Sequence, residues 1–197
     1  MSEPKKNEAG NQSGPTLSEF FSQKNVFTVK HLAIMAVLLA IRIILNMPFL
    51  TIYLAPEFKL ITFAYLTDAI TAMLFGPIAG IVFAFAGDSL GFLASSGSGG
   101  AYFPGFAVSE MVTCFIFAAF FFKRRVTWPR VIAAWALNLA IVLLGMNSMW
   151  LILMYGMDAG AVFTAMRFIS NVAQSPVHIA LMFFILKKVG SIKIDRP

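Results

Sequence analysis

Residues 75–91 read FGPIAGIVFAFAGDSLG, and this stretch decides the class of fold. Its only ionisable residue is Asp88. The dipeptide Gly76-Pro77 interrupts the apolar run and predicts a very tight link between two helices. The glycine pairs at positions 76 and 80 and at positions 87 and 91 have the small-xxx-small spacing that lets helix backbones approach closely in lipid. The stretch therefore predicts helices that pack against each other within a membrane.

The composition of the chain indicates an integral membrane protein. Of its 197 residues, 59% are hydrophobic and 12% are charged, and the mean hydropathy is +0.81. Soluble domains carry about twice that share of charged residues. A bilayer span needs roughly 20 mostly apolar residues, so about six spans fit and no room is left for a sizeable soluble domain.

The chain divides into three parts. Residues 1–26 are polar and predict a disordered cytoplasmic tail, because they carry too little apolar surface to fold alone. Residues 27–190 form the membrane domain, and residues 191–197 form a cytoplasmic C-terminal tail. The first apolar stretch is too long for the core of a signal peptide. The single cysteine, Cys114, excludes an internal disulfide and is expected to be a small buried hydrophobic residue.

The expected fold is an all-α membrane protein with six transmembrane helices. Pro104 and Pro129 suit the first turns of two of these helices, because a proline there removes no hydrogen bond. The helices are expected at about residues 27–48, 59–75, 77–95, 104–123, 129–155 and 160–188.

The positive charges predict the orientation of this bundle. They gather before the first helix, between the fourth and fifth helices, and after the sixth, all on one side of the membrane. The opposite loops hold only Lys59, with Glu57 and Asp158. The positive-inside rule therefore places both termini in the cytoplasm and the loop of residues 95–103 outside. The pI of about 9.7 is then a signal of topology and not of nucleic-acid binding. The clustered cations are Lys5, Lys6, Lys24, Lys30, Lys123, Arg124, Arg125, Arg130, Lys187, Lys188, Lys193 and Arg196.

Ionisable residues inside a span are costly and mark a site or a paired structural contact. Arg42 and Arg167 fall in the outer halves of their helices, at about 1.5 Å per residue. Asp68 and Asp88 fall near the middle of the membrane. Glu110 lies about two turns into its helix, and its role is left open. The uncharged Tyr65, Asn147 and Trp150 also fall in outer halves. This asymmetry predicts a pocket open to the outside and not a pore.

Two interpretations of these charges stay open. Arg42 and Arg167 suit an anionic ligand, because a guanidinium binds a carboxylate through two parallel hydrogen bonds. Arg42 is also able to extend to the interface. Asp68 and Asp88 either pair with the arginines or accept hydrogen bonds from the amino edge of a heterocycle.

Polar residues form one stripe on the sixth helix. Arg167, Asn171, Gln174 and His178 follow each other at spacings of four, three and four, which places them on one helix face. The stripe either binds a ligand or forms a hydrogen-bonded seam between helices. We favour a ligand for Arg167 and the seam for His178, the deepest of the four.

Two further features have a structural and a functional interpretation. Tyr102, Phe103 and Trp150 either belong to the aromatic belt of the interface or stack on a flat ligand. Ala36 and Ala40 either pack within the bundle or dock another membrane subunit.

Common catalytic motifs are missing from the sequence. It contains no GxxxxGK[ST] for ATP, and no HExxH, CxxC or GxSxG. No internal repeat typical of carriers is visible. A small protein with an outer pocket and no energy source of its own needs that source from another protein.

These features together resemble the substrate-binding S components of energy-coupling factor (ECF) vitamin transporters, and the folate-specific type among them. The series GPxxG, GDxxG and YFPGF is fairly specific to folate-type members, whereas SNVAQSPVH at residues 170–178 diverges. The matching stretches are AVLLAIR at 36–42, FGPIAGIVFAFAGDSLG at 75–91, GGAYFPGF at 99–106 and MNSMWLILMYG at 146–156.

The resemblance implies a transport subunit of a bacterial cell membrane, with no enzymatic activity and no cofactor. Such a subunit captures its vitamin outside and associates with a transmembrane coupling subunit and two cytoplasmic ATPases. It is thought to topple in the membrane to release the vitamin inside. Ala36 and Ala40 would face the coupling subunit. The expected substrate-binding residues are Arg42, Tyr65, Asp68, Asp88, Tyr102, Phe103, Pro104, Gly105, Asn147, Trp150, Arg167 and Asn171.

The stretch SSGSGGAYFPGF at residues 95–106 then has a role. Gly97, Gly99 and Gly100 form a lid that moves at low conformational cost, and residues 102–104 form its rigid edge. Folate fits the pocket, with a pterin for stacking and hydrogen bonding and glutamate carboxylates for arginine. The alternatives are the same architecture with another vitamin or heterocyclic precursor, and a membrane enzyme that uses Asp68, Asp88 and His178.

Overall fold

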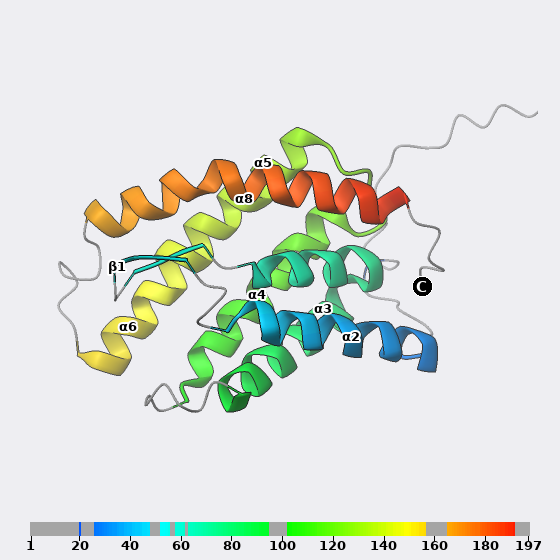
Figure 1. Cartoon of the computed structure of the whole chain (residues 1–197), viewed down its shortest axis with the longest axis horizontal. Helices are drawn as coiled ribbons and strands as arrows, with labels where there is room; N and C mark the ends of the chain where they lie inside the picture. Colours follow the sequence, from blue (N-terminus) through cyan, green and yellow to red (C-terminus); the bar gives the residue numbers. More distant parts are fainter. Residues whose placement is uncertain are drawn as a thin grey trace, which may run out of the picture.

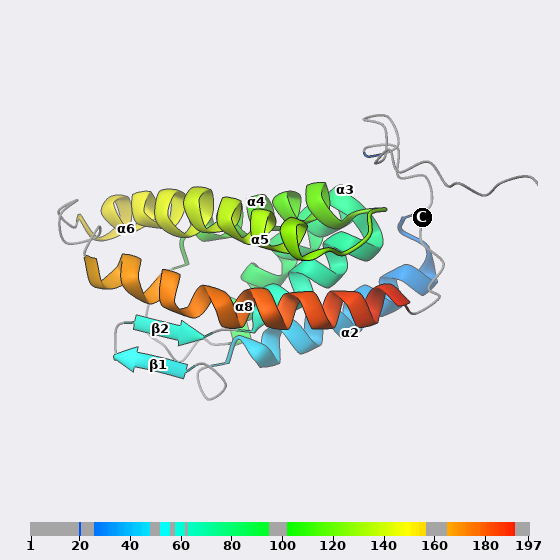
Figure 2. The same cartoon turned by 90° about the horizontal axis from the view of Figure 1, so that it is seen from above.

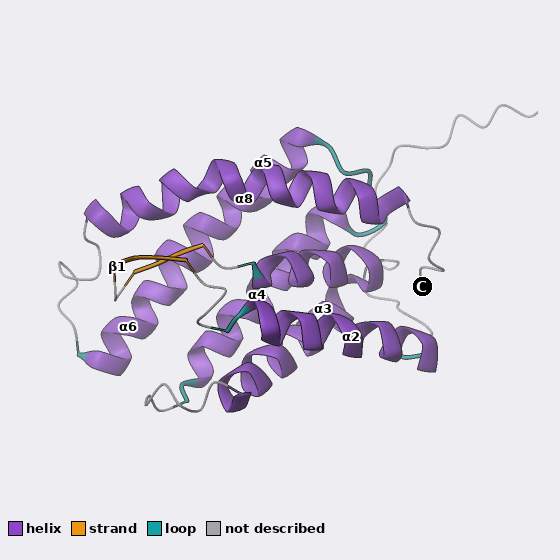
Figure 3. Cartoon of the chain, in the orientation of Figure 1, coloured by secondary structure: helices purple, strands orange, loops and turns teal. Residues whose placement is uncertain are grey.

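The structure is a computed structural model in which helices make up most of the chain (Figures 1 and 3). It describes residues 20, 26–47, 52–55, 58–61, 63–94, 102–156 and 165–191. The elements are α2 (Val29–Leu45), β1 (Ile52–Ala55), β2 (Phe58–Ile61), α3 (Ala64–Ala94), α4 (Pro104–Phe121), α5 (Trp128–Asn138), the π-helix η2 (Leu139–Met146), α6 (Asn147–Tyr155) and α8 (Ala165–Ser191).

Helix α3 contains the tight link that the sequence predicts. Gly76 has φ 83° and ψ −171°, a conformation that favours glycine and interrupts the helix directly before Pro77. A Cβ atom added to Gly80 would lie 3.7 Å from the Cα atom of Ala72. Residues this far apart in a straight helix would be separated by about 12 Å. The two halves of α3 therefore fold back against each other at Gly76.

A pair of strands stands where the second helix was expected to begin. β1 and β2 pair antiparallel, with Ile52 opposite Ile61 and Tyr53 opposite Lys59. The prediction of a helix from residue 59 is therefore wrong, because α3 begins at Ala64. A short apolar run does not distinguish a strand from a helix by its period, and the β-branched and aromatic residues here favour a strand.

The proline positions agree with the sequence analysis. Pro104 is the first residue of α4, and Pro129 lies in the first turn of α5. The expected helix at 129–155 is continuous from α5 through η2 to α6, but its middle is a π-helix. Residues 157–164, where the sixth helix was expected to begin, lie outside the described residues.

The core lies between α3, α4 and α8. Its largest fully buried side chains include Phe75, Phe117, Phe121 and Met182, and Cys114 is completely buried beside them, as expected. Large apolar side chains also cover much of the outside of the bundle. Within the described residues, four helices are long and apolar enough to cross a membrane, namely Ala64–Ala94, Pro104–Phe121, Trp128–Met154 and Phe168–Ser191.

The two ends of the bundle differ in what they contain. The start of α2, the turn between α4 and α5, and the end of α8 lie together at one end (Figures 1 and 2). The clustered cations of the described residues belong to these three segments. The strand pair, the end of α6 and the start of α8 lie at the opposite end.

Candidate functional site

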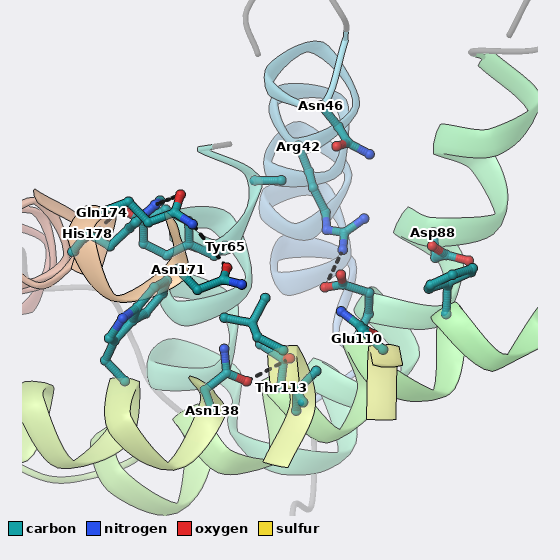
Figure 4. Close-up of a pocket in the computed structure, with 16 residues that line it drawn as sticks. Arg42, Asn46, Tyr65, Asp88, Glu110, Thr113, Asn138, Asn171, Gln174 and His178 are labelled. Carbon is teal, nitrogen blue, oxygen red and sulfur yellow. Dashed lines mark hydrogen bonds and ion pairs between the residues drawn. The ribbon is translucent and has the colours of Figure 1, made fainter. Parts of the chain in front are cut away.

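A cavity of about 350 Å³ lies among α2, α3, α4, α8 and the continuous α5–η2–α6 helix. This volume is within the usual range for a small-molecule site, about 300–1,000 Å³. Charged side chains line one side of it, and aromatic and amide side chains line the other (Figure 4). The lining residues are Arg42, Asn46, Ala64, Tyr65, Asp88, Phe106, Glu110, Thr113, Trp135, Asn138, Val142, Leu143, Asn147, Asn171, Gln174 and His178.

Two carboxyl groups hold Arg42 on the charged side. Its Nε donates to Oδ1 of Asp68 at 2.7 Å, and its Nη2 donates to Oε2 of Glu110 at 3.1 Å. Arg42 is 3% exposed and Asp68 is fully buried, whereas the Glu110 side chain is 37% exposed. A buried charge is tolerated in a membrane protein when it is paired in this way. The structure therefore balances the Arg42 charge with carboxyl groups of the chain itself.

Gly87 makes room for this ion-paired arginine. A Cβ atom at Gly87 would lie 2.6 Å from Nη1 and 2.8 Å from Cδ of Arg42. Any side chain at that position would displace the guanidinium from its two partners. Gly87 thus permits the helix of Asp88 to approach α2 closely enough for Asp88 to line the same side of the cavity.

Aromatic rings form the opposite side. The rings of Trp135 and His178 are stacked, with their centroids 4.7 Å apart and an interplanar angle of 15°. Tyr65 meets both rings edge-on, at 5.2 Å from Trp135 and 4.6 Å from His178. Nε2 of His178 lies 3.2 Å from Oε1 of Gln174, whose Nε2 donates to Oδ1 of Asn171 at 3.0 Å. The polar stripe of α8 thus faces the cavity and also forms a hydrogen-bonded seam.

Polar groups of α4 and of the α5–η2–α6 helix lie between these two sides. Thr113 donates to Oδ1 of Asn138 at 2.9 Å. In the π-helix the backbone N–H of Asn147 donates to the carbonyl of Val142, five residues earlier. This spacing places Asn147 above Val142 on the same helix face, and both line the cavity. π-Helical turns occur frequently at functional sites.

The structure brings five of the twelve predicted substrate-binding residues to the cavity. These come from four different segments of the chain. Arg42 lies in the last turn of α2 and Asn171 lies near the start of α8, away from the ends of these helices that carry the clustered cations. The five residues are Arg42, Tyr65, Asp88, Asn147 and Asn171.

Asp68 does not line the cavity, because it lies behind Arg42 as its ion-pair partner. Its second oxygen, Oδ2, has no hydrogen-bond partner among the described residues. Of the two interpretations of Asp68, the geometry therefore fits the structural ion pair. Asp88 lines the cavity beside the paired arginine. Its position therefore fits the other interpretation, in which a carboxylate accepts hydrogen bonds from a ligand.

The predicted aromatic residues form a separate cluster at the start of α4. Phe103 contacts the rings of Trp150 and Phe106, with centroid distances of 5.7 and 5.9 Å. Trp150 donates from Nε1 to Ser109 at 3.0 Å. Gly105 is buried under Phe103 and Trp150, where a Cβ atom would lie within 2.7 Å of the Trp150 ring. Within the described residues, only Phe106 connects this cluster to the cavity.

Tyr102 and Pro104 complete the start of α4 without lining the cavity. The Tyr102 hydroxyl lies 3.1 Å from Oγ of Ser89, and its ring lies 5.2 Å from Phe92. Pro104 is exposed. Tyr102 therefore fixes the start of α4 to the end of α3.

The remaining predicted residues lie away from the cavity or outside the described part of the chain. Arg167 lies in α8, but its side chain is outside the described part of the chain. The predicted gating glycines, Gly97, Gly99 and Gly100, lie outside the described residues. Ala36 and Ala40 are described, and both are exposed on the outer face of α2.

The sequence analysis did not select several residues that line the cavity. Glu110 and Thr113 have a spacing of three on α4, and Trp135 and Asn138 have the same spacing on α5, so a search for polar or aromatic pairs on one helix face would have found them. Gln174 was noted in the polar stripe with its role left open, and His178 was interpreted as part of a seam. No group of three potential metal ligands is assembled among the described residues.

Comparisons with known proteins agree with this architecture. Residues 30–191 match the family model described as "ECF transporter, substrate-specific component". The chain is 33% identical to "Folate transporter FolT" of Clostridium novyi (strain NT) over 135 residues, which cover 68% of this chain and 76% of the relative. It is 30% identical to "Folate transporter FolT" of Leuconostoc mesenteroides over 155 residues, which cover 76% and 83% of the two chains.

A solved structure is also similar. "Crystal structure of FolT bound with folic acid" superposes with a TM-score of 0.73 and 28% sequence identity, covering 82% of this chain and 95% of that one. The family consists of transport subunits and not of enzymes. The match over residues 30–191, together with the apolar helices, therefore shows that this multi-pass membrane protein belongs to the substrate-specific components of ECF transporters.

Proposed function

We propose that the chain is the folate-binding subunit of an ECF transporter in a bacterial plasma membrane. It captures folate from the outside and delivers it inward when docked on a transmembrane coupling subunit and two cytoplasmic ATPases. We also propose that the chain crosses the membrane six times and has both termini in the cytoplasm. The names of both relatives and the folic acid complex of the similar structure support folate as the ligand.

The composition of the cavity is the observation that carries this proposal. A pterin is a flat ring with an amino group and a ring N–H along one edge. The stacked pair of Trp135 and His178, with the edge of Tyr65, offers aromatic surface to such a ring. The carboxyl oxygens of Asp88 and Glu110 on the opposite side accept hydrogen bonds from the donor edge.

The glutamate tail of folate needs a different partner. Arg42 already holds two carboxyl groups, so an additional carboxylate would compete with them. We assign the tail to Arg167, which precedes Asn171 by four residues and shares its helix face by register. The predicted lid at Gly97, Gly99 and Gly100 stays a prediction.

Identification of the bound molecule is the direct test. The full chain would be purified in detergent and denatured, and any released small molecule would be identified by mass spectrometry. Stripped protein would then be titrated with folate, thiamine, riboflavin and biotin by tryptophan quenching. A folate bound at about one molecule per chain supports the proposal. Another vitamin in its place would keep the family architecture and contradict folate as the ligand.

Pteroic acid, which lacks the glutamate, tests how the ligand is oriented. Replacing Arg167→Gln should weaken folate binding roughly 10- to 100-fold, the effect of losing a charged hydrogen bond. The same substitution should leave pteroic acid binding unchanged, and Arg167→Lys should retain part of the folate affinity. Equal losses for both ligands would place the tail elsewhere.

A further inference from the structure

A second cleft, of about 450 Å³, lies between the turn from α4 to α5 and the end of α8. These two segments are at the end of the bundle where the cations gather (Figures 1 and 2). One wall is the turn between α4 and α5, the other wall is the end of α8, and Met73 of α3 lies between them. Its lining residues are Met73, Lys123, Arg124, Arg125, Val126, Leu186, Lys187, Gly190 and Ser191. The cleft shares no residue with the folate cavity proposed above.

Every ionisable residue that lines this cleft is a cation. Lys123, Arg124, Arg125 and Lys187 contribute four positive charges from two walls. The carboxyl groups whose side chains the structure describes are Asp68, Asp88 and Glu110, and all three lie at Arg42 or at the first cavity. The described residues therefore provide no carboxyl group to balance the positive charge of the cleft. An anionic ligand would balance this charge.

Hydrogen bonds to the backbone hold the cationic turn in shape. Lys123 has a positive φ of 53°, which is uncommon for a residue other than glycine. The N–H of Arg124 donates to the carbonyl of Phe121 at 3.2 Å, and Nη1 of Arg130 donates to the carbonyl of Arg125 at 2.9 Å. The turn is thus ordered in a strained conformation that presents successive cations to the cleft, and such strain is concentrated at functional sites.

The surface beside the cleft is apolar and aromatic. Trp128 stacks on Phe183 with centroids 4.0 Å apart and an angle of 18°, and Nζ of Lys187 lies 5.4 Å from the Phe183 centroid. Trp128 is 43% exposed and Phe184 is 64% exposed. Tryptophan at the end of a membrane helix marks the headgroup level of a bilayer. A ligand of this cleft therefore meets cations at one end and an apolar, lipid-depth surface at the other.

We propose that this cleft binds the headgroup of an anionic phospholipid. The phosphodiester lies among the four cations, and the acyl chains extend over Trp128 and Phe184. Basic pockets between membrane helices select anionic headgroups in this way. A soluble phosphate ester would use the cations alone and would leave the apolar surface beside them unused, so the continuity of the two surfaces favours a lipid. The proposal does not depend on the identity of the vitamin.

The test compares two lipids that differ only in the headgroup. The full chain in detergent would be mixed with palmitoyl-oleoyl phosphatidylglycerol or with the matching phosphatidylcholine, and retained lipid would be measured by native mass spectrometry. The double variant Arg124→Gln/Lys187→Gln removes one cation from each wall. The control Lys30→Gln/Lys188→Gln removes the same charge at the same end, from exposed residues that do not line the cleft.

The wild-type chain and the control should retain phosphatidylglycerol over phosphatidylcholine. The cleft variant should bind phosphatidylglycerol on the order of 10- to 30-fold more weakly, as expected for two cations at a membrane surface. Folate titration of the same samples reports an intact fold, so loss of lipid with retained folate binding supports the cleft.

Other outcomes would overturn the proposal. Equal retention of both lipids, or an equal loss in the control variant, would mean that no headgroup site exists. Competition by glycerol 3-phosphate as effective as the lipid itself would identify a site for free phosphate esters. Unchanged lipid binding in the cleft variant, with loss of its association with the coupling subunit, would assign the cleft to a protein partner.

Discussion

Arg42 and Gly87 depend on each other across two helices. The guanidinium of Arg42, held by Asp68 and Glu110, fills the space where a Cβ atom of residue 87 would lie. This position therefore requires glycine. We predict that Gly87→Ala lowers the free energy of unfolding by about 1–3 kcal/mol, as overpacking of a filled core does. The measurement is thermal unfolding of the purified protein in detergent, followed by tryptophan fluorescence.

Gly91 provides the matched control on the same helix, one turn later. A Cβ atom there would meet only Nδ2 of Asn46, at 3.7 Å, which is ordinary van der Waals contact. Gly91→Ala should therefore be neutral or should stabilise the helix by roughly 0.5–1 kcal/mol. If both alanine variants unfold like the wild type, the ion-paired arginine does not require a glycine at position 87.

The Arg42–Asp68 pair should show strong energetic coupling. Arg42→Gln leaves the fully buried Asp68 without its cation, and loss of one partner of a buried pair costs about 3–5 kcal/mol. The double variant Arg42→Gln/Asp68→Asn should be more stable than the sum of the single effects predicts, by about 1–3 kcal/mol. A double-mutant cycle of unfolding in detergent measures this difference, and additive single effects would contradict the pairing.

At the scale of elements, the π-helix η2 decides which side chains of its long helix reach the cavity. Asn138 lines the cavity before it and Asn147 lines it afterwards, with a π-turn between Val142 and Asn147. A regular α-helix turns by about 100° per residue, so it would place Asn147 away from Val142. The sequence contains no pattern that identifies a π-helix. Asn147 was assigned to the site through its depth in the outer half of its helix and the resemblance of MNSMW, and not through periodicity.

Insertion of one alanine between Met146 and Asn147, at the start of the regular helix α6, should rotate the residues that follow by about 100°, which removes Asn147 from the cavity and Trp150 from its bond to Ser109. Folate affinity should fall at least about tenfold, because a polar group of the site is lost. Deletion of Leu144 should instead convert the π-segment to a regular helix. Asn147 would then follow Val142 by four positions and stay on the same helix face, so this variant should bind nearly as well. Equal affinity in both variants would show that the register of α6 does not matter for binding.

At the scale of the whole molecule, the sequence predicted the parts that depend on local chemistry. The reversal at Gly76-Pro77 and the start of α4 at Pro104 follow from backbone restrictions of single residues, and the structure has both. The strand pair and the membership of the cavity depend on how distant segments meet. Trp135 and His178 stack across two helices, and Asp68 lies behind Arg42. Periodicity within one helix does not indicate such contacts between helices.

In the proposed transporter, the outer face of α2 offers a way to test binding and transport separately. Ala36 and Ala40 are exposed there, and the proposed coupling subunit would pack against these small side chains. We predict that Ala36→Leu/Ala40→Leu leaves folate binding unchanged but strongly lowers folate uptake, since larger side chains hold the two helices apart. Uptake would be measured in proteoliposomes that contain the chain with its coupling subunit and ATPases.

Ala136 and Ala140 give a control with the same spacing on a different exposed face. The double variant Ala136→Leu/Ala140→Leu adds the same volume in lipid contact and should change neither binding nor uptake. If both pairs lower uptake equally, added bulk on any face impairs movement of the subunit, and α2 has no special role. If only the α2 pair does so while folate remains bound, the small-residue face of α2 couples the binding subunit to its ATP-driven partner.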